Sequence, residues 1–219
     1  MSFSYALRRM LGHLHYGFSQ LRYGLILAPL GKGEPLSKAQ WNSRYEEGYS
    51  EKQLSSLNDF ARYMIIAGYI HLLGKTPAVL DIGCGDGILV GAMPDASFEA
   101  YLGIDLSEEA IRKANARALQ NAQFEVGNFE DWMPKQNYDV IVFNETLYYA
   151  KDPLALVERY AGCLKEGGMI IVSMCRFLHH PLMLWRNLEK VFDTVDSTVI
   201  KTHKGELYNV KVLARSQLH

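Results

Sequence analysis

The feature that most constrains the fold is a short apolar run that ends in three closely spaced glycines. Residues 79–87 read Val-Leu-Asp-Ile-Gly-Cys-Gly-Asp-Gly. The apolar residues predict a strand, and Gly83, Gly85 and Gly87 predict a tight turn, because glycine tolerates positive φ and leaves space over the backbone. Ile88-Leu89-Val90 then begins a helix whose first N–H groups lack intrahelical partners. This order predicts a site for a nucleotide-like ligand at the turn.

The spacing of the glycines and one acid distinguish this turn from a dinucleotide site. The motif is G-x-G-x-G rather than G-x-G-x-x-G, and Asp81 precedes the first glycine. We expect a carboxylate there to repel a pyrophosphate and to attract an ammonium or a sulfonium. Cys84, inside the turn, is expected to serve as a small side chain beside the ligand.

A second acid follows the next predicted strand. Tyr101-Leu102-Gly103-Ile104 ends at Asp105, and an acid at this position of a βαβ unit can accept hydrogen bonds from both ribose hydroxyls. The alternative is that Asp105 only caps the following helix. Ser107 and the acids after it already supply that cap, so the ribose role is preferred.

Four blocks together resemble the signature motifs of class I S-adenosylmethionine-dependent methyltransferases. They are residues 81–87, 103–107, 138–143 and 164–172. The stretch Asn144–Tyr149 looks most like the small-molecule branch that includes the nodulation N-methyltransferase. The resemblance implies an α/β fold with a seven-stranded, mostly parallel Rossmann-like sheet, an antiparallel C-terminal hairpin strand and helices on both faces. It also implies S-adenosyl-L-methionine as cofactor and S-adenosyl-L-homocysteine as product.

The predicted domain organisation is an N-terminal helical extension at 1–40 and a methyltransferase domain at 41–219. Residues 1–33 carry basic and apolar side chains at helical spacings and no acid. A helical cap over the active site or a dimer contact is the preferred interpretation, and an amphipathic helix on an anionic membrane is the alternative. We therefore expect a monomer or a homodimer through this helix, without a membrane partner or a signal peptide.

The composition restricts which molecules the protein is expected to bind and in which cellular compartment it is expected to lie. The net charge of −1 gives no global basic field for nucleic acid, so a small-molecule acceptor is expected. Three cysteines without a C-x-x-C pair predict a reduced, cytoplasmic location. No H-x-x-x-H or H-E-x-x-H motif occurs, and no metal site is predicted.

Further cofactor contacts are implied by the resemblance. Trp41, Tyr45 and Tyr49 are candidates for an aromatic lid, although they could simply pack a helix onto the core. Asn128 and Phe129 stand where relatives carry an acid and a small residue beside adenine, and the Asn128 amide can still accept or donate there. The remaining candidate cofactor residues are Leu106 and Asn144. Arg62 could reach the cofactor carboxylate, but an exposed arginine is the preferred interpretation.

The other elements follow from periodicity and caps. A helix over 55–73 is predicted to turn Leu57, Phe60, Met64, Ile65 and Tyr69 inward. Helices are also expected over 108–119 and 153–164, with N-caps at Ser107 and Asp152, and a further helix is expected to end near 192. Strands are predicted at 124–126, 138–143 and 169–172, and a hairpin at 194–200 and 207–213.

Methyl transfer from a sulfonium needs an aligned nucleophile and a dry site, and four residues are candidates for that work. Glu145 and His179 are candidate general bases. Tyr148 and Tyr149 offer hydroxyls for a polar acceptor and ring faces for a cationic product. The alternatives are a solvated acid, a surface histidine and a tyrosine in the core.

The expected reaction is methylation of N or O in a small polar molecule, with an amino sugar implied by the resemblance. The stretch after residue 143 lacks the Asn/Asp-Pro-Pro-Tyr motif of nucleic-acid amine methyltransferases and the acids of magnesium-dependent catechol enzymes. One alternative is a non-catalytic methyltransferase-like binding protein. The other is a nicotinamide-dependent oxidoreductase, whose extra glycine and Tyr-x-x-x-Lys set are absent.

Overall fold

The computed structural model describes residues 22–51, 56–72, 76–94, 97–176 and 182–216. Most of the predicted N-terminal helix and the candidate His179 lie outside these residues. No helix among the described residues has the length and apolar character needed to cross a bilayer.

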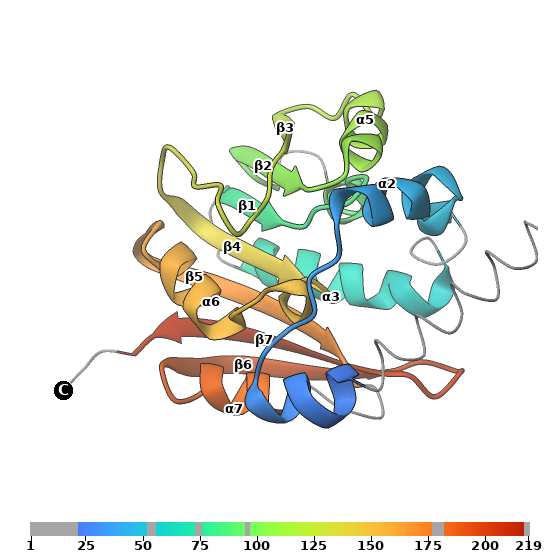
Figure 1. The fold of residues 1–219 in the computed structure, drawn as a ribbon. Coiled ribbons are helices and arrows are strands. Elements are labelled where there is room, and N and C mark those ends of the chain that lie inside the picture. The colour runs from blue at the N-terminus through green and yellow to red at the C-terminus, as the bar shows by residue number, and fades with distance from the viewer. Residues whose placement is uncertain (1–21, 52–55, 73–75, 95–96, 177–181, 217–219) are drawn as a thin grey trace, which may run out of the picture.

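The core of the structure is one seven-stranded sheet in the order β3-β2-β1-β4-β5-β7-β6 (Figure 1). Strands β1 to β5 pair in parallel, and β7 runs antiparallel to both β5 and β6. The strands are β1 Ala78–Ile82, β2 Ala100–Asp105, β3 Ala122–Val126, β4 Tyr138–Asn144, β5 Leu164–Cys175, β6 Phe192–Lys201 and β7 Leu207–Arg215. This topology confirms the predicted mostly parallel sheet with its closing hairpin.

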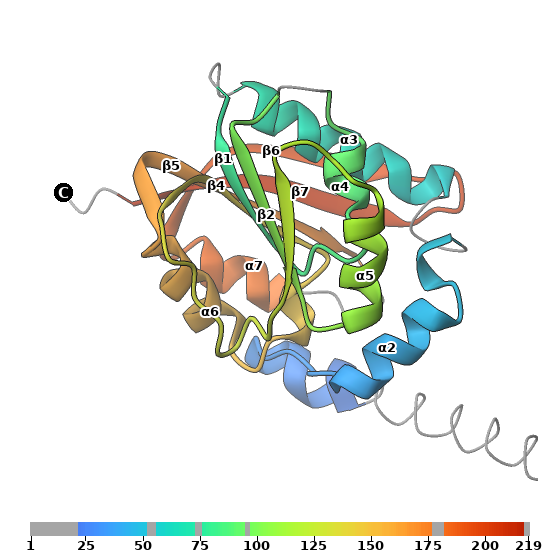
Figure 2. The same ribbon diagram turned by 90° about the horizontal axis from the view of Figure 1, so that it is seen from above.

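Helices cover both faces of the sheet (Figure 2). One face packs against α3 Leu57–Leu72, α4 Ile88–Gly91 and α5 Glu108–Ala116, and the other against α6 Pro153–Ala161 and α7 Leu182–Leu188. Helix α2, Lys38–Glu46, contacts α5. Short helical turns within the described residues include Tyr23–Leu27, Ala28–Leu30 and Leu147–Tyr149.

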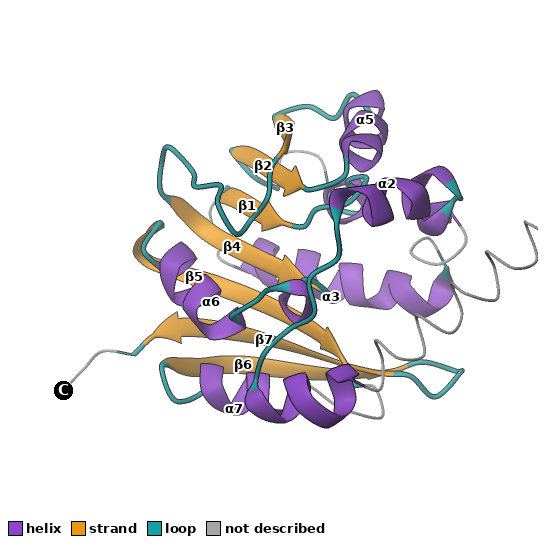
Figure 3. Cartoon of the chain, in the orientation of Figure 1, coloured by secondary structure: helices purple, strands orange, loops and turns teal. Residues whose placement is uncertain are grey.

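Side chains that alternate between the two faces of the central strands form two hydrophobic cores, one on each side of the sheet. Val79, Val140 and Val142 are buried toward α3, whereas Leu80 and Ile141 are buried toward α6. Successive strand residues point to opposite faces, and a parallel strand covered on both sides therefore reads as a continuous apolar run. Because the parallel strands share one direction, the loops after β1, β2 and β4 gather at the same edge (Figure 3).

The helix starts follow the predicted caps. The Ser107 side chain accepts from the backbone N–H of Ala110, and Asp152, followed by Pro153, accepts from that of Ala155. Ser37 forms a capping box with Gln40 at the start of α2.

Two helix ends lie earlier in the chain than predicted. Helix α5 ends at Ala116 rather than at 119. Helix α6 ends at Ala161, and β5 already begins at Leu164, which pairs with Tyr138 before the register shifts. The glycines at 167 and 168 therefore belong to an irregular part of β5 and not to a helix C-terminus.

The predicted inward face of α3 is correct only in part: Ile65 and Tyr69 are partly buried and pack against the core, but two other predicted residues do not. Phe60 and Met64 are 42% and 45% exposed, whereas Tyr63, Ile66 and Ile70 are buried. The buried stripe includes Arg62, a polar residue that periodicity assigned to solvent. The helix is thus rotated so that a guanidinium joins its inner face.

We predict that Ile66→Ala lowers the free energy of unfolding by about 2–5 kcal/mol, because it leaves a cavity in a fully buried position. Met64→Ala, two residues earlier on the same helix, should cost less than about 1 kcal/mol. Urea unfolding of both variants measures the difference, and equal losses would contradict the observed phase.

Candidate functional site

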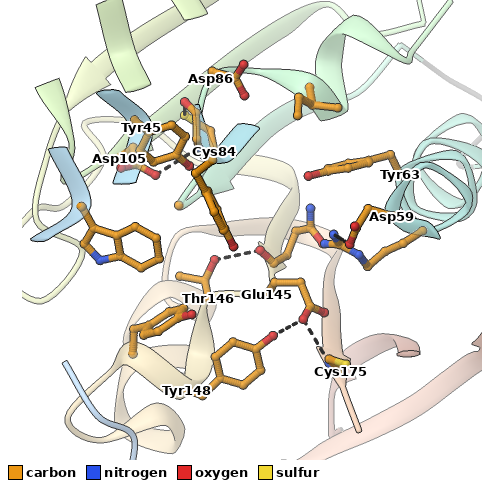
Figure 4. Close-up of a pocket in the computed structure, with 18 of the residues that line it drawn as sticks. Tyr45, Asp59, Tyr63, Cys84, Asp86, Asp105, Glu145, Thr146, Tyr148 and Cys175 are labelled. Carbon is orange, nitrogen blue, oxygen red and sulfur yellow. Dashed lines mark hydrogen bonds and ion pairs between the residues drawn. The ribbon is translucent and has the colours of Figure 1, made fainter. Parts of the chain in front are cut away.

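A cavity of about 490 Å³ lies at the carboxyl edge of the sheet. Its floor comes from the loops that follow β1, β2 and β4, and its walls come from α2, α3 and the turn between β6 and β7. Figure 4 shows the side chains that converge there. Open α/β sheets bind ligands at this edge.

The turn after β1 requires glycine at the positions that line the cavity. Gly83 and Gly85 have φ of 75° and 57°. A Cβ on Gly83 would lie 2.6 Å from the Thr146 hydroxyl, and one on Gly85 would lie 2.6 Å from the Tyr45 hydroxyl. Gly87 also has positive φ but caps α4 outside the cavity lining. Glycine is therefore required at both positions, because Thr146 and Tyr45 pack directly over the turn.

Asp105 joins this turn to the end of β2. Its Oδ2 accepts from the backbone N–H of Gly85 at 3.0 Å, and its Oδ1 accepts from that of Ser107 at 2.8 Å. Burial raises the pKa of Asp105 to about 6, and the backbone hydrogen bonds oppose that rise. A carboxylate oxygen can accept a second hydrogen bond, so Asp105 can tie down the turn and still bind a ligand.

Asp81 lies away from the cavity lining, contrary to the expectation that it faces the ligand. It occupies β1 on the same sheet face as Val79, and the Tyr101 hydroxyl donates to its Oδ2. Its Oδ1 has no partner among the described residues. Burial raises the pKa of Asp81 to about 7, although the Tyr101 bond opposes the rise.

Glu145 is held in an uncommon backbone conformation at the end of β4. Its φ of 57° is costly for a residue with a side chain. The Ser173 hydroxyl donates to Oε1 at 2.9 Å, and the Cys175 backbone N–H donates to Oε2 at 3.1 Å. The Tyr148 hydroxyl also donates to Oε2 (Figure 4). The carboxylate is therefore fixed at one end of the cavity.

Arg62 corrects the interpretation as an exposed arginine, because its side chain is only 1% exposed and lines the cavity. It donates to the Asn144 Oδ1 and, at 3.0 Å, to Asp59. Burial lowers the pKa of Arg62, but Glu145 and other acidic neighbours more than offset this, so the guanidinium stays charged. The Asp59–Arg62 spacing of i, i+3 was the available sequence signal.

Aromatic rings form the wall toward α2. The Trp41 and Tyr149 rings meet edge to face at 4.9 Å between centroids, and Tyr45 and Tyr49 meet in the same way at 5.8 Å. The Tyr45 carbonyl also accepts from the Lys113 ammonium on α5 at 2.8 Å. These aromatic residues thus line the cavity and attach α2 to the domain, which combines the two interpretations left open by the sequence.

The segment before α2 is attached to the loop after β4. The backbone N–H of Glu34 donates to the Tyr148 carbonyl at 2.7 Å, and Lys32 forms an ion pair with Asp152. A Cβ on Gly33 would lie 2.2 Å from the Ala150 carbonyl oxygen. This link, residues 31–34, therefore packs directly against the loop that contains the candidate catalytic residues Tyr148 and Tyr149.

Most of the candidate site residues meet in the cavity. Those that line it are Tyr45, Gly83, Cys84, Gly85, Asp105, Leu106, Phe129, Asn144, Glu145, Tyr148 and Tyr149. Asn128 is exposed outside the lining, where its amide bonds Asp131 and the Glu130 backbone. Sequence reasoning missed Asp59, Thr146 and Tyr208, and no motif marked Tyr208 on the C-terminal hairpin.

Comparison with known families decides the classification. A family model described as a methyltransferase domain matches residues 73–214, more than half of the chain. The chain belongs to this methyltransferase family. The resemblance to class I S-adenosylmethionine-dependent methyltransferases is thereby confirmed.

Curated relatives of this methyltransferase are ubiquinone biosynthesis O-methyltransferases. The one from Neisseria meningitidis serogroup C (strain 053442) is 29% identical over 161 residues, 71% of this chain and 65% of the relative. The one from Paraburkholderia xenovorans (strain LB400) is 38% identical over 128 residues, 56% of this chain and 53% of the relative. The chain thus spans between about half and two thirds of these relatives' length.

Solved structures with the same fold include two methyltransferases. The N-methyltransferase NodS from Bradyrhizobium japonicum WM9, in complex with S-adenosyl-L-homocysteine, has a TM-score of 0.68 at 15% identity and covers 82% of this chain and 100% of its own. Magnesium protoporphyrin IX methyltransferase (ChlM) from Synechocystis PCC 6803 has the same TM-score and identity and covers 82% and 95%. These likenesses concern the fold.

The raised pKa of Asp81 predicts a pH-dependent stability. Between the unfolded pKa near 4 and the folded pKa of about 7, the folded state holds a proton that the unfolded state has lost, so stability falls as pH rises. We expect the free energy of unfolding to drop by about 1–3 kcal/mol between pH 5 and pH 8. Asp105 contributes with the same sign. Urea titrations should show a smaller drop in Asp81→Asn, and an unchanged drop would contradict the assignment.

Proposed function

We propose that the protein is a methyltransferase of EC 2.1.1 type that moves a methyl group from S-adenosyl-L-methionine to N or O of a small polar molecule. Family membership supports the donor and the reaction class. One observation carries the proposal: the Asp105 carboxylate lines the cavity and accepts a hydrogen bond from the Gly85 backbone N–H in the glycine turn.

The cavity residues fit this cofactor. Asp105 would accept from the ribose hydroxyls, and Leu106 and Phe129 offer apolar surfaces for adenine. The turn at Gly83–Gly85 lines the cavity where the methionine part would lie, and Arg62 carries more N–H groups than its two bonds to Asn144 and Asp59 use. The Arg62 Nε is buried and has no partner among the described residues.

The protein's side chains would align the two reactants and exclude water from the cavity. When bound, S-adenosyl-L-methionine supplies a methyl group that its sulfonium charge has already activated. Trp41, Tyr45 and Tyr149 wall the cavity and keep water out. Good alignment of two reactants can lower the barrier by about 7–11 kcal/mol, so positioning is the main requirement.

The Glu145–Tyr148 pair orients the acceptor. Burial and the adjacent Glu145 raise the pKa of Tyr148. The phenol therefore stays protonated and donates a hydrogen bond to the Glu145 carboxylate. The Tyr148 oxygen can accept a hydrogen bond from an acceptor N–H or O–H, and Glu145 can take up the released proton. Tyr149 packs against Tyr148 edge to face and completes the wall. His179 stays a second candidate base outside the described residues.

The finer expectations stay predictions. The names of the curated relatives favour an oxygen acceptor, whereas an amino sugar rests on the sequence resemblance alone. The cytoplasmic location, the choice between monomer and homodimer, and the division at residue 40 are predictions of the same kind.

Calorimetric titration of the purified protein tests the donor. We expect S-adenosyl-L-homocysteine to bind and NADH not to bind, because Asp105 and the G-x-G-x-G turn suit an adenosyl group without a pyrophosphate. Binding of NADH alone would instead identify an oxidoreductase.

We predict that Asp105→Ala weakens binding of S-adenosyl-L-homocysteine by about 1–3 kcal/mol, through the loss of hydrogen bonds to a charged group. Glu166→Ala removes an exposed carboxylate outside the cavity lining and serves as the control, with wild-type affinity expected. Unfolding curves should accompany both titrations, because Asp105 also bonds Gly85 and Ser107. A folded Asp105→Ala variant with wild-type affinity would contradict the ribose role.

A further inference from the structure

The cavity lining carries more acids than bases. Its carboxylates are Asp59, Asp86, Asp105, Glu145 and Glu206, and its cations are Arg62 and Lys204. Glu145 is bonded to β5, Asp59 lies on α3, and Figure 4 shows both apart from Cys84 and Asp105. Glu206 lies at the turn between β6 and β7. That end of the cavity is where an acceptor has room beside the proposed cofactor.

Two of these five acids have an ion-pair partner among the residues that the structure describes. Asp59 is paired with Arg62 at 3.0 Å, and Asp86 is paired with Arg117 at 2.9 Å. Glu145 forms no ion pair within the described part of the chain and receives its hydrogen bonds from a phenol, a hydroxyl and a backbone N–H. The Arg62 guanidinium interacts electrostatically with Glu145 and also pairs with Asp59. With the β6–β7 turn included, three carboxylates (Asp59, Glu145 and Glu206) face two cations (Arg62 and Lys204), which leaves one negative charge at this end.

The walls at this end are aromatic rather than aliphatic. Tyr63, Tyr148 and Tyr208 line it, and all three phenols have raised pKa values because of burial, so they are neutral. The described lining has two aliphatic side chains, Ile88 and Leu106, which directly follow the glycine turn and Asp105. A carboxylate surrounded by aromatic faces attracts cations by charge and by cation–π contact.

We propose that the acceptor is a small amine that binds as a cation, with its ammonium at the Glu145 carboxylate and its carbon skeleton among the tyrosine rings. The inference rests on the proposed methyltransferase function and names its substrate class. The left-handed φ of Glu145 supports it, because a strained non-glycine residue persists where the surrounding bonds hold a side chain in a required place.

The reaction of such an acceptor balances with the groups at hand. The bound ammonium gives one proton to the Glu145 carboxylate and becomes a neutral amine. Its nitrogen lone pair then forms the bond to the methyl carbon as the carbon–sulfur bond breaks, and the positive charge passes from sulfur to nitrogen. The methylated ammonium and the neutral thioether leave, and Glu145 returns its proton to solvent.

Three phenols that differ in one side-chain group test the charge preference. They are tyramine with an ammonium, tyrosol with a hydroxyl, and 4-hydroxyphenylacetate with a carboxylate. Each is titrated calorimetrically into protein saturated with S-adenosyl-L-homocysteine. We expect tyramine to bind at least about tenfold more tightly than tyrosol, and the carboxylate to bind most weakly.

A matched pair of variants locates the preference. Glu145→Gln should reduce the tyramine-over-tyrosol ratio to about threefold or less, while S-adenosyl-L-homocysteine still binds. Glu158→Gln makes the same change at an exposed position on α6, outside the lining, and should keep the wild-type ratio.

The outcomes separate the two proposals. Failure of S-adenosyl-L-homocysteine to bind would overturn the proposed function. If it binds, then absence of tyramine binding, an equal or reversed preference, or a preference unchanged in Glu145→Gln would overturn the amine assignment alone.

Discussion

The hydrogen bonds between the first glycine turn and the end of β2 are the constraint on which the site depends. Gly83 and Cys84 donate their backbone N–H groups to the Ile104 carbonyl, and Gly85 donates to Asp105. These bonds fix a turn that only glycine can make and place one carboxylate beside it. The cavity, the proposed ribose contact and the start of α4 all follow from this connection between adjacent parallel strands.

The opposite end of the cavity is organised by charge. Glu145, Arg62 and Asp59 are brought together by β4 and α3, and each is held by hydrogen bonds because an unpartnered buried charge is costly. One guanidinium serves two carboxylates there. The two ends of the cavity thus have different chemistry, one shaped to the backbone turn and the other to an acidic, aromatic pocket.

The sequence predicted the sheet, the glycine turn and Asp105 because local chemistry determines them: alternation, positive φ and helix caps act within a few residues. It did not predict Arg62 or Tyr208, because their burial depends on how α3 and the C-terminal hairpin pack against β4 and β5. Asp81 shows the same limit. The motif draws attention to Asp81, but the hydrogen bond from Tyr101 and the absence of Asp81 from the cavity lining show that it does not face the ligand site.

The link at residues 31–34 shows how the N-terminal region can influence specificity without supplying a reactive group. Its backbone bonds the Tyr148 carbonyl, and Gly33 fits so closely against Ala150 that no side chain can be added. An insertion or deletion in this link would move the phenol that touches Glu145. During evolution, acceptor preference could therefore drift through changes in chain length outside every signature motif.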